Sequence, residues 1–145
     1  MNYILDTNIL IEYLRGYQET ADFLSLNRCF EHPNTAIIAI VTQAELYAFA
    51  IKNNWGEKRI NALESILNQL VIVPIDTKSL VKKYAEIDAF SQGLLPKIPL
   101  GRSAVNMGKN DLWIAATTSI LNGTLLTTDN DFKHLNEIYL ILLKK

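Results

Sequence analysis

The chain has little cysteine and no apolar run long enough to cross a membrane. Cys29 is the only cysteine among 145 residues, so an intrachain disulfide is excluded, and a reducing cytoplasm is the expected compartment. The first six residues contain no basic segment leading into an apolar core, so we expect no signal peptide. The apolar run 138–143 is too short for a bilayer and predicts a buried strand instead. We therefore expect a cytoplasmic protein without membrane contacts.

An excess of charge of either sign is also missing. The 14 Lys and Arg residues nearly balance the 15 Asp and Glu residues, which leaves a formal net charge of −1. No global positive field attracts nucleic acid, so any such binding must come from local Lys and Arg patches or from bound metal ions. The length suits one domain, residues 1–145, with one hydrophobic core.

Short apolar runs alternate with helical patterns along the whole chain. Strands are predicted at 2–5, 35–41, 70–73, 124–127 and in the final apolar run. Helices are predicted at 9–14, 19–30, 42–53, 57–69, 77–90 and 110–121, and a loop rich in Pro and Gly at 92–109. Because the strands are nearly all apolar, this order predicts an α/β fold with a mainly parallel sheet covered on both faces.

Four acids stand just after a predicted strand or at the start of a helix: Asp6, Glu45, Asp111 and Asp129. Each has an ordinary structural explanation. Asp6 or Asn8 suits a helix N-cap, and Thr42 with Glu45 matches a capping box. Asp111 favours a helix N-terminus, and Asp129 suits a turn or a cap. In parallel α/β sheets, however, ligands bind outside the carboxyl ends of the strands, so these four acids would meet at one edge.

Several carboxylates crowded at one edge repel one another, and burial increases that repulsion. A divalent cation relieves it by supplying the opposing charge. Oxygen ligands without Cys or His nearby indicate Mg²⁺ or Mn²⁺ rather than zinc. Such an ion activates water and neutralises phosphate oxygens, so the pattern favours a phosphodiesterase, a metal-dependent nuclease.

Four motifs, in order, resemble those of the PIN domains, especially the VapC-like toxins of type II toxin–antitoxin systems. The motifs are Leu-Asp-Thr-Asn-Ile-Leu at 5–10, Thr-Gln-Ala-Glu-Leu at 42–46, Asp-Leu-Trp-Ile-Ala-Ala at 111–116 and Leu-Thr-Thr-Asp-Asn-Asp-Phe at 126–132. The resemblance implies a three-layer α/β/α sandwich and Mg²⁺- or Mn²⁺-dependent endoribonuclease activity on single-stranded or structured RNA. It also implies a homodimer and a cognate antitoxin that blocks the acidic site.

The resemblance carries over to the acids residue by residue. Asp6, Glu45 and Asp111 match the first three catalytic and metal-binding acids of the family. The fourth falls on Asp129, because the Thr-x-Asp pattern of the family aligns there, with Asp131 as a nearby alternative.

Two polar positions and three cations are candidates for contact with the substrate. Asn8 and Thr127 match family positions that orient the acids or the phosphate, although capping and strand-end hydrogen bonds explain them equally well. Lys97, Arg102 and Lys109 lie in or beside the 92–109 loop. They either follow the RNA backbone or are solvated loop charges.

Two other classes of function compete with this interpretation. A PIN-like module that binds RNA or protein without catalysis would be expected to lose some of the acids, whereas this chain has all of them. A phosphatase with Asp6 as nucleophile would require a second Asp two positions later, where this chain has Asn8. His134 is close to the Asp129 motif but is not needed by the metal-dependent chemistry, and we expect it at the surface.

Overall fold

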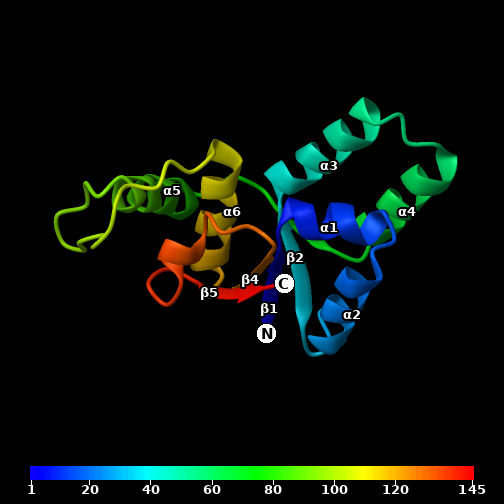
Figure 1. Cartoon of the computed structure of the whole chain (residues 1–145), viewed down its shortest axis with the longest axis horizontal. Coiled ribbons are helices and arrows are strands. Elements are labelled where there is room, and N and C mark those ends of the chain that lie inside the picture. The colour runs from blue at the N-terminus through cyan, green and yellow to red at the C-terminus, as the bar shows by residue number, and fades with distance from the viewer.

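Five short strands form one sheet at the centre of the computed structural model, which describes residues 1–145 (Figure 1). The strands are β1 (Asn2–Leu5), β2 (Thr35–Ala39), β3 (Val71–Val73), β4 (Thr124–Thr127) and β5 (Ile141–Lys144). They lie in the order β3-β2-β1-β4-β5, and every neighbouring pair is parallel. The predicted parallel sheet is therefore confirmed, with β1 at its centre.

Helices cover both faces of this sheet. They are α1 (Thr7–Leu14), α2 (Gln18–Leu26), α3 (Ile40–Lys52), α4 (Glu57–Leu67), α5 (Lys78–Ser91) and α6 (Lys109–Ile120), with a 3₁₀ turn η1 (Lys133–Leu135). Figure 1 shows α1–α4 on one side of the sheet and α5, α6 and η1 on the other. None of these helices is both long and apolar enough to cross a bilayer.

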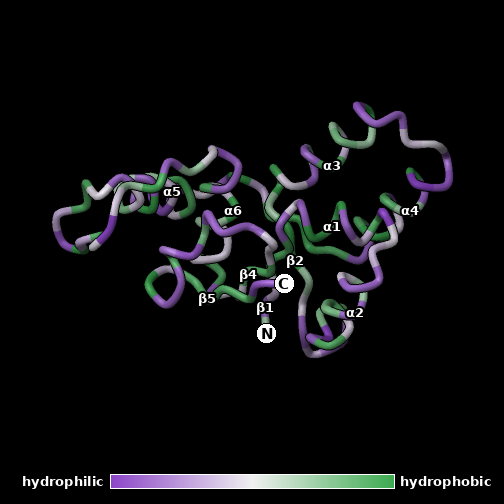
Figure 2. Tube along the Cα trace, in the orientation of Figure 1, coloured by the Kyte–Doolittle hydropathy of each residue, from purple (hydrophilic) through white to green (hydrophobic).

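Each face of the sheet has its own hydrophobic core, because successive strand residues point to opposite faces. Leu5 packs with Leu10 and Leu46 against α1–α4, whereas Ile4 packs with Ile114 and Phe90 against α5 and α6. Figure 2 shows apolar residues concentrated along the central strands and polar residues toward the outer turns. This burial of both faces makes the molecule a three-layer α/β/α sandwich, as predicted.

Several boundaries differ from the sequence prediction. The predicted helix 19–30 ends at Leu26, and the first helix begins at Thr7 rather than at residue 9. The predicted strand 35–41 ends at Ala39, and α3 begins at Ile40, two residues earlier than expected. The predicted final buried strand begins only at Ile141, and that residue is 53% exposed. Because β5 is an edge strand with a single neighbour, its apolar composition does not imply burial on every side.

The turn between α6 and β4 requires glycine. A Cβ on Gly123 would lie 2.1 Å from Cδ1 of Ile4 and 3.1 Å from the backbone oxygen of Asn2. Asn122, just before it, has a φ of +49°, the left-handed conformation that Asn tolerates. This close approach lets β4 lie directly beside β1, and so brings the ends of the two central strands together.

Candidate active site

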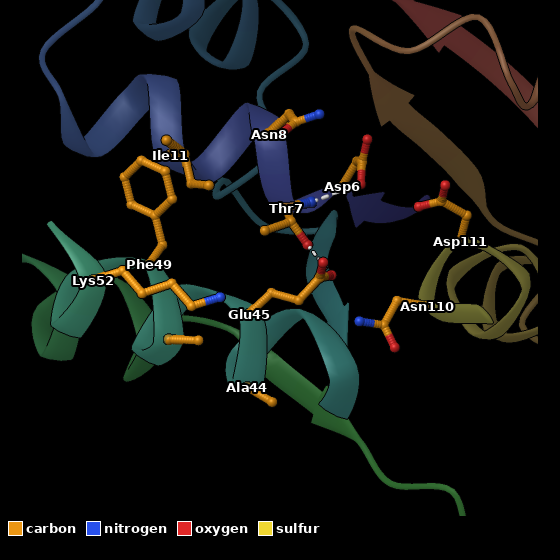
Figure 3. Close-up of a pocket in the computed structure, with 11 residues that line it drawn as sticks. Asp6, Thr7, Asn8, Ile11, Ala44, Glu45, Phe49, Lys52, Asn110 and Asp111 are labelled. Atoms are coloured by element: carbon orange, nitrogen blue, oxygen red, sulfur yellow. Dashed lines mark hydrogen bonds between the residues drawn. The ribbon is translucent and has the colours of Figure 1, made fainter. Parts of the chain in front are cut away.

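Acidic side chains from four parts of the chain gather at the carboxyl edge of the sheet. Asp6 follows β1 and Asp129 follows β4, while Glu45 lies on α3 and Asp111 in the first turn of α6. A cleft of about 580 Å³ contains Asp6, Glu45 and Asp111 in its lining. Figure 3 shows these three carboxylates pointing into it from three different elements.

Asp6 is both the N-cap of α1 and a member of this group. Its Oδ1 accepts a hydrogen bond of 2.7 Å from the backbone N–H of Thr7, and its Oδ2 accepts one of 2.6 Å from the hydroxyl of Thr127. Only 4% of the residue is exposed. The cap interpretation and the site interpretation are therefore compatible, because one carboxylate occupies both positions.

Glu45 is held by a side chain rather than by its own helix. The Thr7 hydroxyl donates a 2.8 Å hydrogen bond to Oε1 of Glu45, which Figure 3 marks with a dashed line. The capping box suggested for Thr42 and Glu45 does not form, because α3 starts at Ile40 and its N-cap, Ala39, makes no side-chain bond. Glu45 thus faces the cleft instead of capping a helix.

Asp131 lies closer to the other acids than its exposed position suggests. Asp111, Asp129 and Asp131 each place a carboxylate oxygen within 4.8 Å of the others. The turn after β4 produces this grouping: the Thr127 hydroxyl accepts the N–H of Asp129, and Oδ1 of Asp129 accepts the N–H of Asp131. The geometry brings both candidates for the fourth acid to the site.

The electrostatics of the site oppose the charged form of two of its acids. Burial raises the pKa of Asp6 from 3.8 to about 6, although its bonds from Thr127 and Thr7 act in the opposite direction. Burial, followed by the charges of Asp6, Asp129 and Glu45, raises the pKa of Asp111 to about 7. Carboxyl pKa values raised this strongly are concentrated at functional sites, where like charges lie close together.

The predicted substrate contacts are distributed unevenly. Asn8 lies exposed in the lining of the main cleft, and Lys109 lines a neighbouring hollow together with Glu45 and Asp111. Thr127 is completely buried and contacts Asp6, so its observed role is to hold that acid.

Lys97 and Arg102 are exposed and line neither of these hollows.

Three residues that the sequence analysis did not select also belong to the site. Thr7 holds Glu45, while Asn110 and Lys52 line the cleft. The position of Asn110 directly before Asp111 is a usable signal, since it shares the first turn of α6. The roles of Thr7 and Lys52 depend on how α1 packs beside α3, which no local motif specifies.

The surface position expected for His134 is wrong. The residue is 8% exposed, and its Nε2 lies 2.7 Å from the hydroxyl of the buried Ser91. Burial, together with the charge of Arg102, lowers its pKa, so the neutral ring is favoured. It is a core side chain and takes no part in the acid cluster.

The donor set of the acid cluster fits a hard divalent cation. Asp111, Asp129 and Asp131 offer only carboxylate oxygens, and no histidine or cysteine belongs to the group. Oxygen-only ligands suit Mg²⁺ or Mn²⁺ better than zinc. Such an ion would also compensate the charges that raise the pKa of Asp111.

The fold and the site together define an acid-cluster α/β/α domain. The chain belongs to the PIN domain family, whose model matches residues 3–138. Among curated proteins it is 28% identical to ribonuclease VapC2 of Haemophilus influenzae over 130 residues, which is 90% of this chain and 87% of that protein.

Two solved structures show the same fold. VapBC2 from Rickettsia felis, bound to a DNA fragment from its promoter, superposes with a TM-score of 0.75 at 26% identity, covering 99% of this chain and 98% of that chain. VapBC-1 from nontypeable Haemophilus influenzae gives a TM-score of 0.75 at 24% identity, with the same coverage.

Proposed function

We propose that this protein is an endoribonuclease that uses Mg²⁺ or Mn²⁺ to hydrolyse phosphodiester bonds of single-stranded RNA. The observation that supports this most directly is the convergence of Asp6, Glu45, Asp111 and Asp129 on one edge of the sheet. The ribonuclease name of the H. influenzae relatives agrees with it. The net charge of −1 means that the chain has no excess positive charge to attract phosphate, so a bound cation is expected to provide it.

Each acid has its own role in this reaction. Asp6 and Asp111 hold the principal ion, and Glu45 and Asp129 contribute directly or through water, with Asp131 as the alternative to Asp129. When bound, such an ion favours ionisation of water and neutralises the charge that develops on phosphate oxygens.

Hydroxyl groups keep two of these carboxylates in position, and amide groups line the cleft beside them. Thr127 orients Asp6 and Thr7 orients Glu45, so both carboxylates are fixed before a ligand arrives. Asn8 and Asn110, on opposite sides of the cleft in Figure 3, offer amide groups for contact with an RNA substrate. Lys109 provides positive charge beside Asp111.

Cleavage of an unstructured RNA oligonucleotide tests the activity. Wild-type protein should cleave with Mg²⁺ or Mn²⁺ and lose activity in excess EDTA. Asp6→Asn and Asp111→Asn should each reduce the rate of RNA cleavage by roughly 100-fold or more, because each removes one ligand of the principal ion. Asp22→Asn, an exposed acid on α2, is the matched control and should leave the rate unchanged. Cleavage that survives both substitutions and EDTA would refute the proposal.

We further propose that the protein is the toxin of a toxin–antitoxin pair, as a homodimer in the cytoplasm. The solved neighbours are VapBC and FitAB complexes, which supports an antitoxin as its partner. Co-expression with the product of an adjacent short reading frame should suppress RNA cleavage and yield a co-purifying complex. Growth arrest by wild type, absent with Asp6→Asn, is the expected cellular result.

A further inference from the structure

The cleft that holds the acids continues beyond them, between α1 and α3. Its lining passes from Glu45 across Ile11 and Phe49 to Lys52 at the end of α3. Glu45, Phe49 and Lys52 are spaced at i, i+4 and i+7, so they share one face of the helix. Figure 3 shows this face turned toward α1, with the Phe49 ring against Ile11. The acids therefore lie at one end of a groove with an apolar floor.

Lys52 provides the positive charge of this groove. It is the only cationic side chain among the 11 residues that line the cleft. Its ammonium end is directed back along the groove toward Glu45 in Figure 3, yet no ion pair or hydrogen bond occupies it. The ion pairs of the structure involve Arg28, Lys83 and Lys145 instead. An unpaired ammonium beside an apolar floor is free to bind an anion.

We propose that Lys52 is a positioning residue for the RNA. One phosphate of the RNA lies at the acids, and Lys52 binds the adjacent phosphate of the same RNA chain. This inference rests on the proposed function. Seven residues of helix place the backbone of Lys52 roughly 10 Å from that of Glu45, and its side chain reaches back over part of that span. Ile11 and Phe49 then lie beneath the nucleoside whose ribose connects the two phosphates. Lys109 lies on the other side of the acids, so the strand meets a lysine on each side.

Steady-state cleavage of an unstructured RNA oligonucleotide tests this role, with salt concentration as a second variable. Lys52→Ala should raise KM about tenfold with little change in kcat, the effect of losing one charged hydrogen bond. It should also reduce the steepness of the plot of log binding constant against log salt concentration by roughly 0.7, the value for one phosphate contact in a single strand. Lys52→Arg should restore both. Lys82→Ala, which removes an exposed unpaired charge on α5, is the control and should behave as wild type.

A second assay separates this inference from the proposed function. Fluorescence anisotropy with labelled RNA and Mn²⁺, in an Asp111→Asn background, measures binding without cleavage. Weaker binding on adding Lys52→Ala, with the smaller salt slope, supports the role even if the wild type cleaves no RNA. If Lys52→Ala matches Lys82→Ala in KM, affinity and salt slope, the role is refuted while wild-type cleavage still supports the function. If the groove binds only a protein partner, Lys52→Ala will likewise match Lys82→Ala, and the role is refuted. A Lys52→Ala variant that lowers kcat alone, with KM unchanged, also refutes it.

Discussion

Asp111 is the acid whose removal should stabilise the metal-free protein. No hydrogen bond compensates its burial, and the neighbouring acids add repulsion, so its pKa rises from 3.8 to about 7. The fold therefore disfavours the charged form of Asp111. Asp111→Asn removes the charge while retaining the shape of the side chain, so it should raise the free energy of unfolding at a pH where the wild-type carboxylate is ionised.

The size of this gain follows from the pKa difference. Each pKa unit is worth ~1.4 kcal/mol, so the interval from 3.8 to about 7 corresponds to ~4 kcal/mol for a fully buried carboxylate. Asp111 is only half-buried, and solvent screening reduces this to roughly 1–2 kcal/mol. For a chain of this length the melting temperature should rise by roughly 3–6 °C.

The sign of the pH dependence is fixed by the same shift. A raised carboxyl pKa favours the folded state below the unfolded pKa, and this contribution is lost as the pH rises through the folded pKa. The advantage of Asp111→Asn should therefore be complete at about pH 8. It should fall by about half at about pH 5.5, which lies midway between 3.8 and about 7, and disappear below about pH 4.

Thermal denaturation followed by circular dichroism in EDTA measures the effect at each pH. Asp22→Asn, an exposed carboxylate outside the site, is the control and should shift the melting temperature equally at every pH. Saturating Mn²⁺ should stabilise the wild type more than Asp111→Asn, because the ion then compensates the charge. A variant that is less stable than wild type at about pH 8, or a gap that does not change with pH, would refute the reasoning.

Two further predictions concern residues that support the site. Thr127→Val should weaken Mn²⁺ binding near neutral pH, because the hydroxyl that lowers the pKa of Asp6 and accepts the N–H of Asp129 is lost. Calorimetry measures this affinity, and Thr127→Ser, which keeps the hydroxyl, should bind Mn²⁺ normally. A Val variant that binds Mn²⁺ as tightly as wild type would contradict this role. Gly123→Ala should lower the free energy of unfolding by roughly 1–3 kcal/mol in urea, because its Cβ would lie 2.1 Å from Cδ1 of Ile4. A change below about 0.5 kcal/mol would show that the turn adjusts freely.

The parallel sheet and the placement of the acids were predictable because both depend on short-range patterns. A buried apolar run that ends in Asp6 implies a strand whose carboxyl end carries that acid. Alternating helices then require the other strands to run in the same direction. Asp129 follows from the same rule because it comes just after β4. Asp111 was selected instead as an acid at the start of a predicted helix, and it lies in the first turn of α6.

Features that depend on distances between elements were not predictable. The apolar composition of β5 suggests burial, but only the strand order shows that Ile141 lies at an exposed edge. His134 follows a polar turn in the sequence, yet packing between α5 and η1 buries it against Ser91. Likewise the bond from Thr7 to Glu45 spans two helices, so its existence depends on their separation rather than on either motif.

Asp6 illustrates why a capping interaction and the proposed metal site can share one residue. A helix N-cap needs an acceptor oxygen at the start of the helix, and a parallel sheet places that start at the ligand-binding edge. Oδ1 of Asp6 serves the cap and Oδ2 serves Thr127, but these bonds only partly offset burial, because its pKa still rises to about 6. The fold thus retains an unfavourable carboxylate that a better-solvated cap would avoid. A lower free energy of unfolding is expected where a buried charged group is kept for ligand binding. Neutral replacements in this cluster should therefore raise the free energy of unfolding and abolish the proposed activity.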